Sequence, residues 1–225
     1  MKDKIITIPA GTSNVYLLKN AEHAILIDAG NKHKAQKIML EMEKVGIKPT
    51  SLSAIIITHG HFDHCGSLAE LKKRTKAQVI VHQEEAEALR NGFLELPHGT
   101  NFFSRFLVGL GKLFLKNLGH YTPVEPDIII DQTFDMKKFG FDAILIPTPG
   151  HTPGSLTLIW KKNAFVGDSA FNIIGTGVYP PFANHPTNLL LSWNAILQSG
   201  VEYIYPGHGK PFHRSGLMRT YQKHT

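Results

Sequence analysis

The stretch "IIITHGHFDHCGS", from Ile55 to Ser67, is the most informative part of this sequence. It begins with β-branched residues, which favour a buried strand, and then places three histidines and one aspartate within six positions. A strand that only packs into a core has no need of imidazole side chains at its end. Because imidazole nitrogens and carboxylate oxygens bind zinc, iron and manganese, the stretch predicts a metal site where a strand ends.

The spacing of these side chains predicts two neighbouring ion positions. In an extended loop, residues two apart point the same way, so His59 and His61 can bind one ion together. A turn into a helix at Asp63 would direct that residue and His64 toward a second position. The single cysteine, Cys65, argues against a structural zinc knot, and we interpret it as a small residue at the start of a packed helix.

Three further candidate ligands follow predicted strands, and each has a glycine beside it. They are His151 in "PTPGHTPGS", Asp168 in "FVGDSAF" and His208 in "YPGHGKP". Glycine lets the backbone turn sharply and approach an ion closely. With the four residues of the first stretch they make seven ligands, too many for one tetrahedral ion but suited to two ions that share a carboxylate and a water. We therefore expect a catalytic centre.

The two halves of the chain have the same predicted order: a strand, a strand ending in aspartate, a helix, and a strand ending in a histidine-bearing loop. In the first half these elements are Asn14 to Lys19, Ala24 to Asp28, about Lys32 to Val45, and a strand ending at Thr58. In the second half they are a strand from Ser155, a strand ending at Asp168, a helix near Pro186 to Gln198, and the strand before His208. This repetition predicts a layered α/β fold with helices on the outer faces.

The interval from Asn91 to Pro126 belongs to neither half. Phenylalanine and leucine recur in it at helical spacing, with basic residues between them. We interpret residues 91–126 as an inserted apolar helical cap that supplies a wall for substrate, with a helix that packs on the core or a contact between two copies of the chain as alternatives.

Composition and charge limit the class of protein. A length of 225 residues suits one domain over residues 1–225, and no apolar run is long enough to cross a bilayer. The net charge of +6 is spread out and is not interleaved with aromatic residues, so we expect a small-molecule substrate and no nucleic-acid partner. With one cysteine and no apparent signal peptide, we expect a cytoplasmic protein. His213 could contact substrate or simply belong to the tail.

The ordered motifs "THGHFDH", "GHTPGS", "GDSAF" and "GHG" resemble the signature of the metallo-β-lactamase fold superfamily, particularly its glyoxalase II-like and lactonase-like branch. The resemblance implies a four-layer αββα sandwich from two similar half-domains. It also divides the predicted ligands between two metals: His59, His61 and His151 for one, Asp63, His64 and His208 for the other, and Asp168 as the bridge. Asp28 would orient the histidine-rich loop by hydrogen bonding.

The activity implied is hydrolysis with two divalent ions, zinc first and manganese or iron as alternatives, which make hydroxide available near neutral pH. Asp63 and Asp168 would hold the hydroxide in line and pass a proton to the leaving group. The apolar cap favours esters, lactones or thioesters with an acyl chain. Glyoxalase II-like enzymes carry a further C-terminal helical region, and this chain ends 17 residues after His208, so we expect a substrate other than a glutathione thioester.

Three alternatives remain from the sequence. Persulfide dioxygenases of the same superfamily use a single iron, which would be held by His59, His151 and Asp168. A nuclease acting on RNA or another phosphodiester is favoured only by the net charge. A metal-binding module without catalysis is the least favoured, because a complete two-metal site is rarely retained without chemistry.

Overall fold

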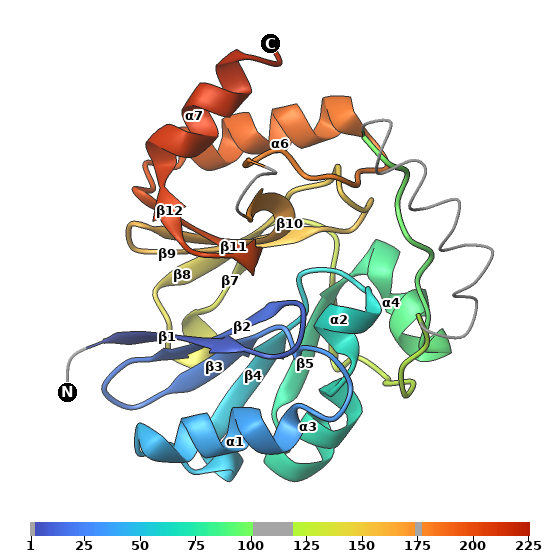
Figure 1. The fold of residues 1–225 in the computed structure, drawn as a ribbon. Helices are drawn as coiled ribbons and strands as arrows, with labels where there is room; N and C mark the ends of the chain where they lie inside the picture. The colour runs from blue at the N-terminus through green and yellow to red at the C-terminus, as the bar shows by residue number, and fades with distance from the viewer. Residues whose placement is uncertain (1–2, 101–118, 174–176) are drawn as a thin grey trace.

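The computed structural model describes residues 3–100, 119–173 and 177–225. These residues form two β-sheets that pack face to face, and helices cover the outer face of each sheet (Figure 1). The layers therefore run helix, sheet, sheet, helix, and the expected αββα sandwich is confirmed.

The described part of the N-terminal sheet has six strands in the order β1-β2-β3-β4-β5-β6. They are β1 (Lys4–Pro9), β2 (Asn14–Lys19), β3 (Ala24–Ile27), β4 (Leu52–Ile56), β5 (Gln78–His82) and β6 (Ile128–Ile130). Strands β1 to β3 pair antiparallel, whereas β3 to β6 run parallel. Apolar residues fill β3 and β4 almost continuously because both faces of this sheet are covered.

The helices of this half are α1 (Ala35–Lys44), the short 3-10 helix η1 (Pro49–Ser51), α2 (Phe62–Cys65), α3 (Leu68–Thr75) and α4 (Gln83–Asn91). Helices α1 and α3 lie on the outer face of the sheet (Figure 1). The buried face of α1 includes Ile38 and Met42, which are four residues apart. Helix α1 begins later than the predicted Lys32 because His33 has a left-handed backbone, with φ 64°, which a helix cannot include.

The described part of the C-terminal sheet also has six strands, in the order β12-β11-β10-β9-β8-β7. They are β7 (Phe134–Asp135), β8 (Ala143–Pro147), β9 (Leu156–Trp160), β10 (Asn163–Asn172), β11 (Tyr203–Gly209) and β12 (Phe212–His213). The helices described in this half are η2 (Lys137–Phe139), α6 (Pro186–Gln198) and α7 (Arg214–Gln222). The order β9, β10, α6, β11 repeats the order β2, β3, α1, β4 of the first half, as the sequence predicts.

Among the residues described, three apolar clusters hold the layers together. Between the two sheets, Tyr16 and Ile56 from one sheet pack with Leu145 from the other. Ile38 of α1 belongs to a second cluster beneath the N-terminal sheet, and Trp193 of α6 belongs to a third above the C-terminal sheet. Burial of one such side chain stabilises the fold by roughly 1.5–3 kcal/mol. This packing makes the sheets a rigid support for the loops between them.

Of the predicted cap over 91–126, residues 101–118 lie outside the described residues. The described flanks, residues 92–100 and 119–126, contain no helix. They contact both halves: Tyr121 donates a hydrogen bond to the carbonyl of Gly60, and Gly99 pairs with Phe182 in an isolated bridge. Across the ranges described, none of the helices combines the length and the apolar character needed to cross a membrane.

Candidate metal centre

The histidine-rich loop after β4 directs its side chains to two places. His59 and His61 lie in the chain before α2, and the backbone of His61 is extended, with φ −73° and ψ 153°. Helix α2 then begins at Phe62 and carries Asp63 and His64. This is the change of direction that the spacing predicts, and it separates the two pairs of side chains.

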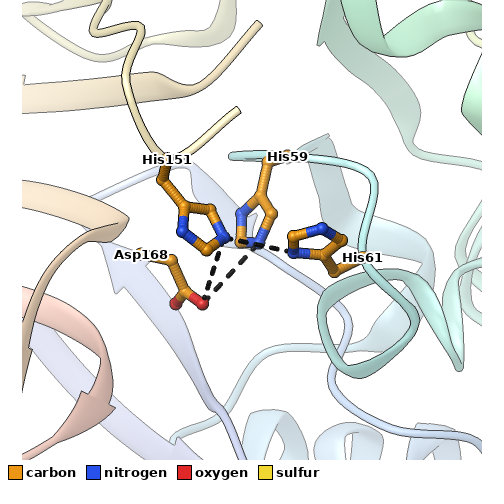
Figure 2. Close-up of side chains that lie close together, drawn as sticks. All are labelled: His59, His61, His151 and Asp168. Carbon is orange, nitrogen blue, oxygen red and sulfur yellow. Dashed lines mark hydrogen bonds and ion pairs between the residues drawn. The ribbon is translucent and has the colours of Figure 1, made fainter. Parts of the chain in front are cut away.

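The first ligand group consists of His59, His61, His151 and Asp168, which are buried and whose ligand atoms lie within 4.8 Å of one another. Their side chains point toward one another (Figure 2). His151 Nε2 lies 3.2 Å from His61 Nδ1 and 3.5 Å from Asp168 Oδ2. His59 Nε2 lies 3.8 Å from the same carboxylate oxygen. Three imidazoles and one carboxylate are a donor set suited to a divalent transition metal.

The second ligand group consists of Asp63, His64 and His208. His208 Nε2 lies 3.4 Å from Asp63 Oδ2. Asp168 also contacts this group, because its Oδ1 lies 3.2 Å from His64 Nε2 and its Oδ2 lies 3.3 Å from His208 Nε2. One carboxylate therefore lies between two groups of ligands.

Asp168 reaches this position through an irregularity in β10. The strand continues to Asn172 instead of ending at Asp168 as expected, but its pairing with β11 shifts on both sides of Gly167. Gly167 has a left-handed backbone, with φ 51°, and a side chain there would place Cβ 2.5 Å from Thr58 Oγ1. Only glycine allows β10 to approach the start of the histidine-rich loop so closely.

Backbone carbonyls set the orientation of two imidazoles in the first ligand group. His61 Nε2 lies 3.3 Å from the carbonyl oxygen of Glu95, and His151 Nδ1 lies 2.9 Å from that of Phe182. A carbonyl only accepts hydrogen bonds, so each of these ring nitrogens carries the proton. The other nitrogen of each ring then presents a lone pair to the centre of the group.

Asp28 and Thr58 set two further rings. His64 Nδ1 donates to Asp28 Oδ2 at 2.8 Å, and Thr58 donates to the same carboxylate through its backbone nitrogen and its hydroxyl. The Thr58 hydroxyl gives its proton to Asp28, so it accepts from His59 Nδ1 at 3.1 Å. The Nε2 atoms of His59 and His64 consequently present lone pairs to the ligand groups. Asp28 has a left-handed backbone, with φ 64°, a conformation tolerated by aspartate.

The β1–β2 turn supports the second ligand group. His208 Nδ1 donates to the carbonyl oxygen of Thr12 at 2.8 Å, which leaves Nε2 free for a ligand. The hydroxyl of Thr12 lies 3.1 Å from Asp63 Oδ2. The ring of His208 also stacks on Phe171, with centroids 4.7 Å apart and planes 12° apart. These contacts hold both side chains from outside the group.

Unsatisfied polar atoms show that the two groups fit metal ions. In the part of the chain that the structure describes, the buried side-chain atoms without a hydrogen-bond partner are His59 Nε2, His64 Nε2 and Asp168 Oδ1. All three belong to the ligand groups and face their interior. A buried polar atom without a partner costs roughly 1–3 kcal/mol, and a cation bound among these lone pairs would remove that cost.

The first ligand group holds its histidines neutral, which is the form that binds a metal. Burial lowers the pKa of His61 and of His151 to about 4, and it holds the pKa of His59 well below its usual value. The three rings are therefore uncharged at neutral pH.

Charged neighbours, more than burial, set the pKa values of His64 and Asp168. Burial opposes a charge on His64, but the carboxylates of Asp168 and Asp28 outweigh it and hold the pKa of His64 well above its usual value. Burial would likewise raise the pKa of Asp168, but His208 and His64 outweigh it and hold that pKa well below the usual range. Asp168 is thus an anion, and without a metal ion His64 holds a proton beside it; a bound ion would replace that proton at Nε2.

Two residues considered from the sequence lie outside both groups. His213 is the N-cap of α7, where its Nδ1 accepts the backbone N–H of Ser215, and its ring contacts Tyr203 edge to face. Cys65 is buried, its sulfur lies 3.5 Å from the carbonyl oxygen of His59, and burial raises the pKa of its thiol. Neither residue belongs to a ligand group.

Sequence reasoning missed several residues that support the centre. Glu95 and Phe182 act through their backbone carbonyls, and so does Thr12 toward His208; such carbonyls are the same for every residue type and leave no pattern in a sequence. The sequence pattern marks Thr58 only as the end of a strand, although its hydroxyl joins Asp28 to His59. A hydroxyl residue directly before "HGH" is the one signal that could have indicated this role.

The sequence profile of the Metallo-beta-lactamase superfamily matches residues 8–208 of this chain. A probable metallo-hydrolase of Methanocaldococcus jannaschii is 29% identical over 203 residues, which is 88% of each chain. The hydroxyacylglutathione hydrolase GloC of Haemophilus influenzae is 29% identical over 175 residues, or 76% of this chain and 73% of the relative.

Solved structures show the same fold. The B3 metallo-beta-lactamase BLEG-1 superposes with a TM-score of 0.73 at 22% identity, over 96% of this chain and 97% of that structure. A metallo-beta-lactamase family protein of Thermus thermophilus superposes with a TM-score of 0.71 at 21% identity. These structures show the fold, and the match of the family profile over residues 8–208 shows that the chain belongs to the metallo-beta-lactamase superfamily.

Proposed function

We propose that the protein is a hydrolase that uses two divalent metal ions and acts on a small molecule with an ester, lactone, thioester or related acyl bond. The observation that carries the proposal is the position of Asp168. Its carboxylate lies 3.5 Å from a ligand atom of the first group and 3.2 and 3.3 Å from ligand atoms of the second. A shared carboxylate of this kind suits a pair of ions that act on one substrate.

Seven residues would hold the ions: His59, His61 and His151 for one, Asp63, His64 and His208 for the other, with Asp168 between them. Zinc is the expected metal, with manganese or iron as alternatives, because the donors are imidazoles and carboxylates without thiolates. Ions bound there would lower the pKa of a water molecule toward neutrality and polarise a carbonyl oxygen of the substrate.

The two aspartates would have different parts in the reaction. Asp168 stays ionised because its pKa is held low, so it can accept a hydrogen bond from the attacking water and orient it. The side chain of Asp63 is more exposed, 12% against 6% for Asp168, and it accepts from the hydroxyl of Thr12. Asp63 is therefore the better placed of the two to exchange a proton with the leaving group.

The names of the relatives support a hydrolase. One is a probable metallo-hydrolase, and another is a hydroxyacylglutathione hydrolase. Because of the second name, a glutathione thioester belongs among the substrates to be tested, beside esters and lactones.

The test is metal content followed by a substrate screen. Protein purified without added metal or chelator is analysed by elemental mass spectrometry, and thioesters, lactones and esters are then assayed for hydrolysis. We expect close to two zinc or manganese ions per chain and hydrolysis of at least one acyl substrate. The variant that tests the role of Asp168 is Asp168→Asn. It removes the charge between the ligand groups, so this protein should lose both ions and its activity.

A different outcome would identify the alternative chemistry. Close to one iron per chain, with oxygen consumption in the presence of a persulfide, would contradict the hydrolase proposal. It would indicate a dioxygenase with a single iron held by His59, His151 and Asp168. Against that alternative stands the second ligand group, in which Asp63, His64 and His208 all lie within reach of one another.

A further inference from the structure

Glu85 is a fully buried acidic residue that the proposed chemistry does not use. It lies in the first turn of α4, and its exposed fraction is 0%. Glutamate is almost never fully buried unless it has partners that offset the loss of water. Its surroundings therefore indicate a specific role.

Both oxygens of the Glu85 side chain accept a backbone N–H. Oε2 accepts from Gly60 at 2.9 Å, and Oε1 accepts from Gly154 at 3.0 Å. Gly60 lies between the ligands His59 and His61, whereas Gly154 lies in the loop that carries His151. One carboxylate thus joins the two loops that supply the three histidines of the first ligand group.

The glycines make this close contact possible. A Cβ atom at Gly154 would lie 2.6 Å from Glu85 Cγ, which no side chain could tolerate without displacement. A Cβ atom at Gly60 would lie 3.1 Å from Glu85 Oε2 and 3.1 Å from Ala88 Cβ. Both loops therefore pack directly against the first turns of α4, with Glu85 between them.

Helix α4 is itself held in place. The side chain of His82 caps its N-terminus by accepting the N–H of Glu84. The hydroxyl of Tyr121 lies 2.8 Å from the carbonyl of Gly60 and 3.0 Å from that of Ala88 on α4. The peptide units on either side of Gly60 are thus anchored to α4 and its neighbours, so the direction of His59 and His61 is fixed by this helix.

We propose that Glu85 is a positioning residue of the first ligand group, which sets the distance between the His59–His61 loop and the His151 loop and thereby the affinity for the ion in that group. The inference rests on the proposed function in that it requires this group to bind a metal. The hydrogen-bond partners described for Glu85, Gly60 and Gly154, lie in the two loops of the first ligand group, so we expect Glu85 to act on the ion in that group.

The test uses Glu85→Gln, which keeps the size of the side chain. Its amide oxygen can accept one of the two N–H groups, but its amide nitrogen, a donor, then faces the other. The matched control is Glu87→Gln, which removes the same charge from the exposed side of α4. Ile38→Val, on the buried face of α1, controls for a general loss of stability.

The affinities of the two ligand groups are measured separately, by introducing Glu85→Gln and its controls into two variant proteins, called the two backgrounds. In His208→Ala protein only the first ligand group is complete, and in His151→Ala protein only the second is complete. Zinc affinity is measured in each background by competition with a chromophoric chelator, and the absorption spectrum of the cobalt-substituted protein reports the geometry around the ion.

We expect Glu85→Gln to weaken zinc binding about 10- to 100-fold in the His208→Ala background and to change the cobalt spectrum. In the His151→Ala background the affinity should change less than twofold, and neither control should alter either affinity. Equal weakening in both backgrounds, or unchanged affinities with a lowered melting temperature, would show a general structural role and overturn the inference. Failure of the unsubstituted protein to bind zinc would instead overturn the proposed function.

Discussion

Asp28 and His64 are joined by a hydrogen bond of 2.8 Å between Oδ2 and Nδ1, although 36 residues separate them in the chain. Asp28 follows β3 and His64 lies on α2, so the bond connects the end of one strand to the helix after the next. The same carboxylate accepts from Thr58 at the start of the histidine-rich loop. Asp28 therefore fixes the orientation of His64 directly and that of His59 through Thr58.

Replacing Asp28 with asparagine should weaken binding of the ion in the second ligand group. Asparagine tolerates the left-handed backbone at this position, so the fold should persist, but the charge that orients and polarises His64 is lost. We expect about 10- to 100-fold weaker zinc binding, measured by chelator competition. The exposed variant Asp142→Asn is the control. Equal affinities in the two variants would contradict this role.

Two histidines near the C-terminus should behave differently when each is replaced by alanine. His208→Ala removes a member of the second ligand group and should reduce the metal content from two ions per chain to one. His213→Ala removes only the cap of α7 and should keep both ions while lowering stability by about 1 kcal/mol or less. Elemental analysis and thermal unfolding of both variants check this, and the assignment fails if the metal content of the two variants is the same.

Removal of the metal should destabilise the protein. The buried lone pairs of His59, His64 and Asp168 lose their partner, and a ligand present at a thousand times its dissociation constant stabilises the native state by about 4 kcal/mol. In a domain of this size each kcal/mol corresponds to roughly 2–4 °C. Thermal unfolding before and after chelation, and again after zinc is restored, measures the difference. An unchanged transition temperature would argue against metal binding by these groups.

Gly167→Ala should be more harmful than Gly200→Ala. Both glycines have a left-handed backbone, with φ 51° and 77°, so both substitutions introduce strain of roughly 1–3 kcal/mol. At Gly167 the new Cβ would also lie 2.5 Å from Thr58 Oγ1, whereas at Gly200 no atom lies within 4 Å. We expect Gly167→Ala alone to reduce metal content, because it displaces Thr58 or Asp168. Comparable metal content in the two variants would refute this.

Much of the fold was predictable from local patterns. The strand from Asn14 to Lys19 and the helix from Pro186 to Gln198 have the predicted bounds, because apolar periodicity and a proline at the helix start are properties of neighbouring residues. The start of α1 was predicted too early, because nothing nearby indicated that His33 adopts a left-handed backbone.

The sequence by itself determined which side chains gather at the centre, since histidine, aspartate and glycine occur there in spacings that have little other use. Only the tertiary structure decided how those side chains are oriented. The carbonyl of Thr12 accepts from His208 across 196 residues, and Glu85 joins loops at Gly60 and Gly154. Such contacts form only when strands from both halves are brought together, and half of their atoms are backbone groups that every residue shares, so no local pattern can encode them.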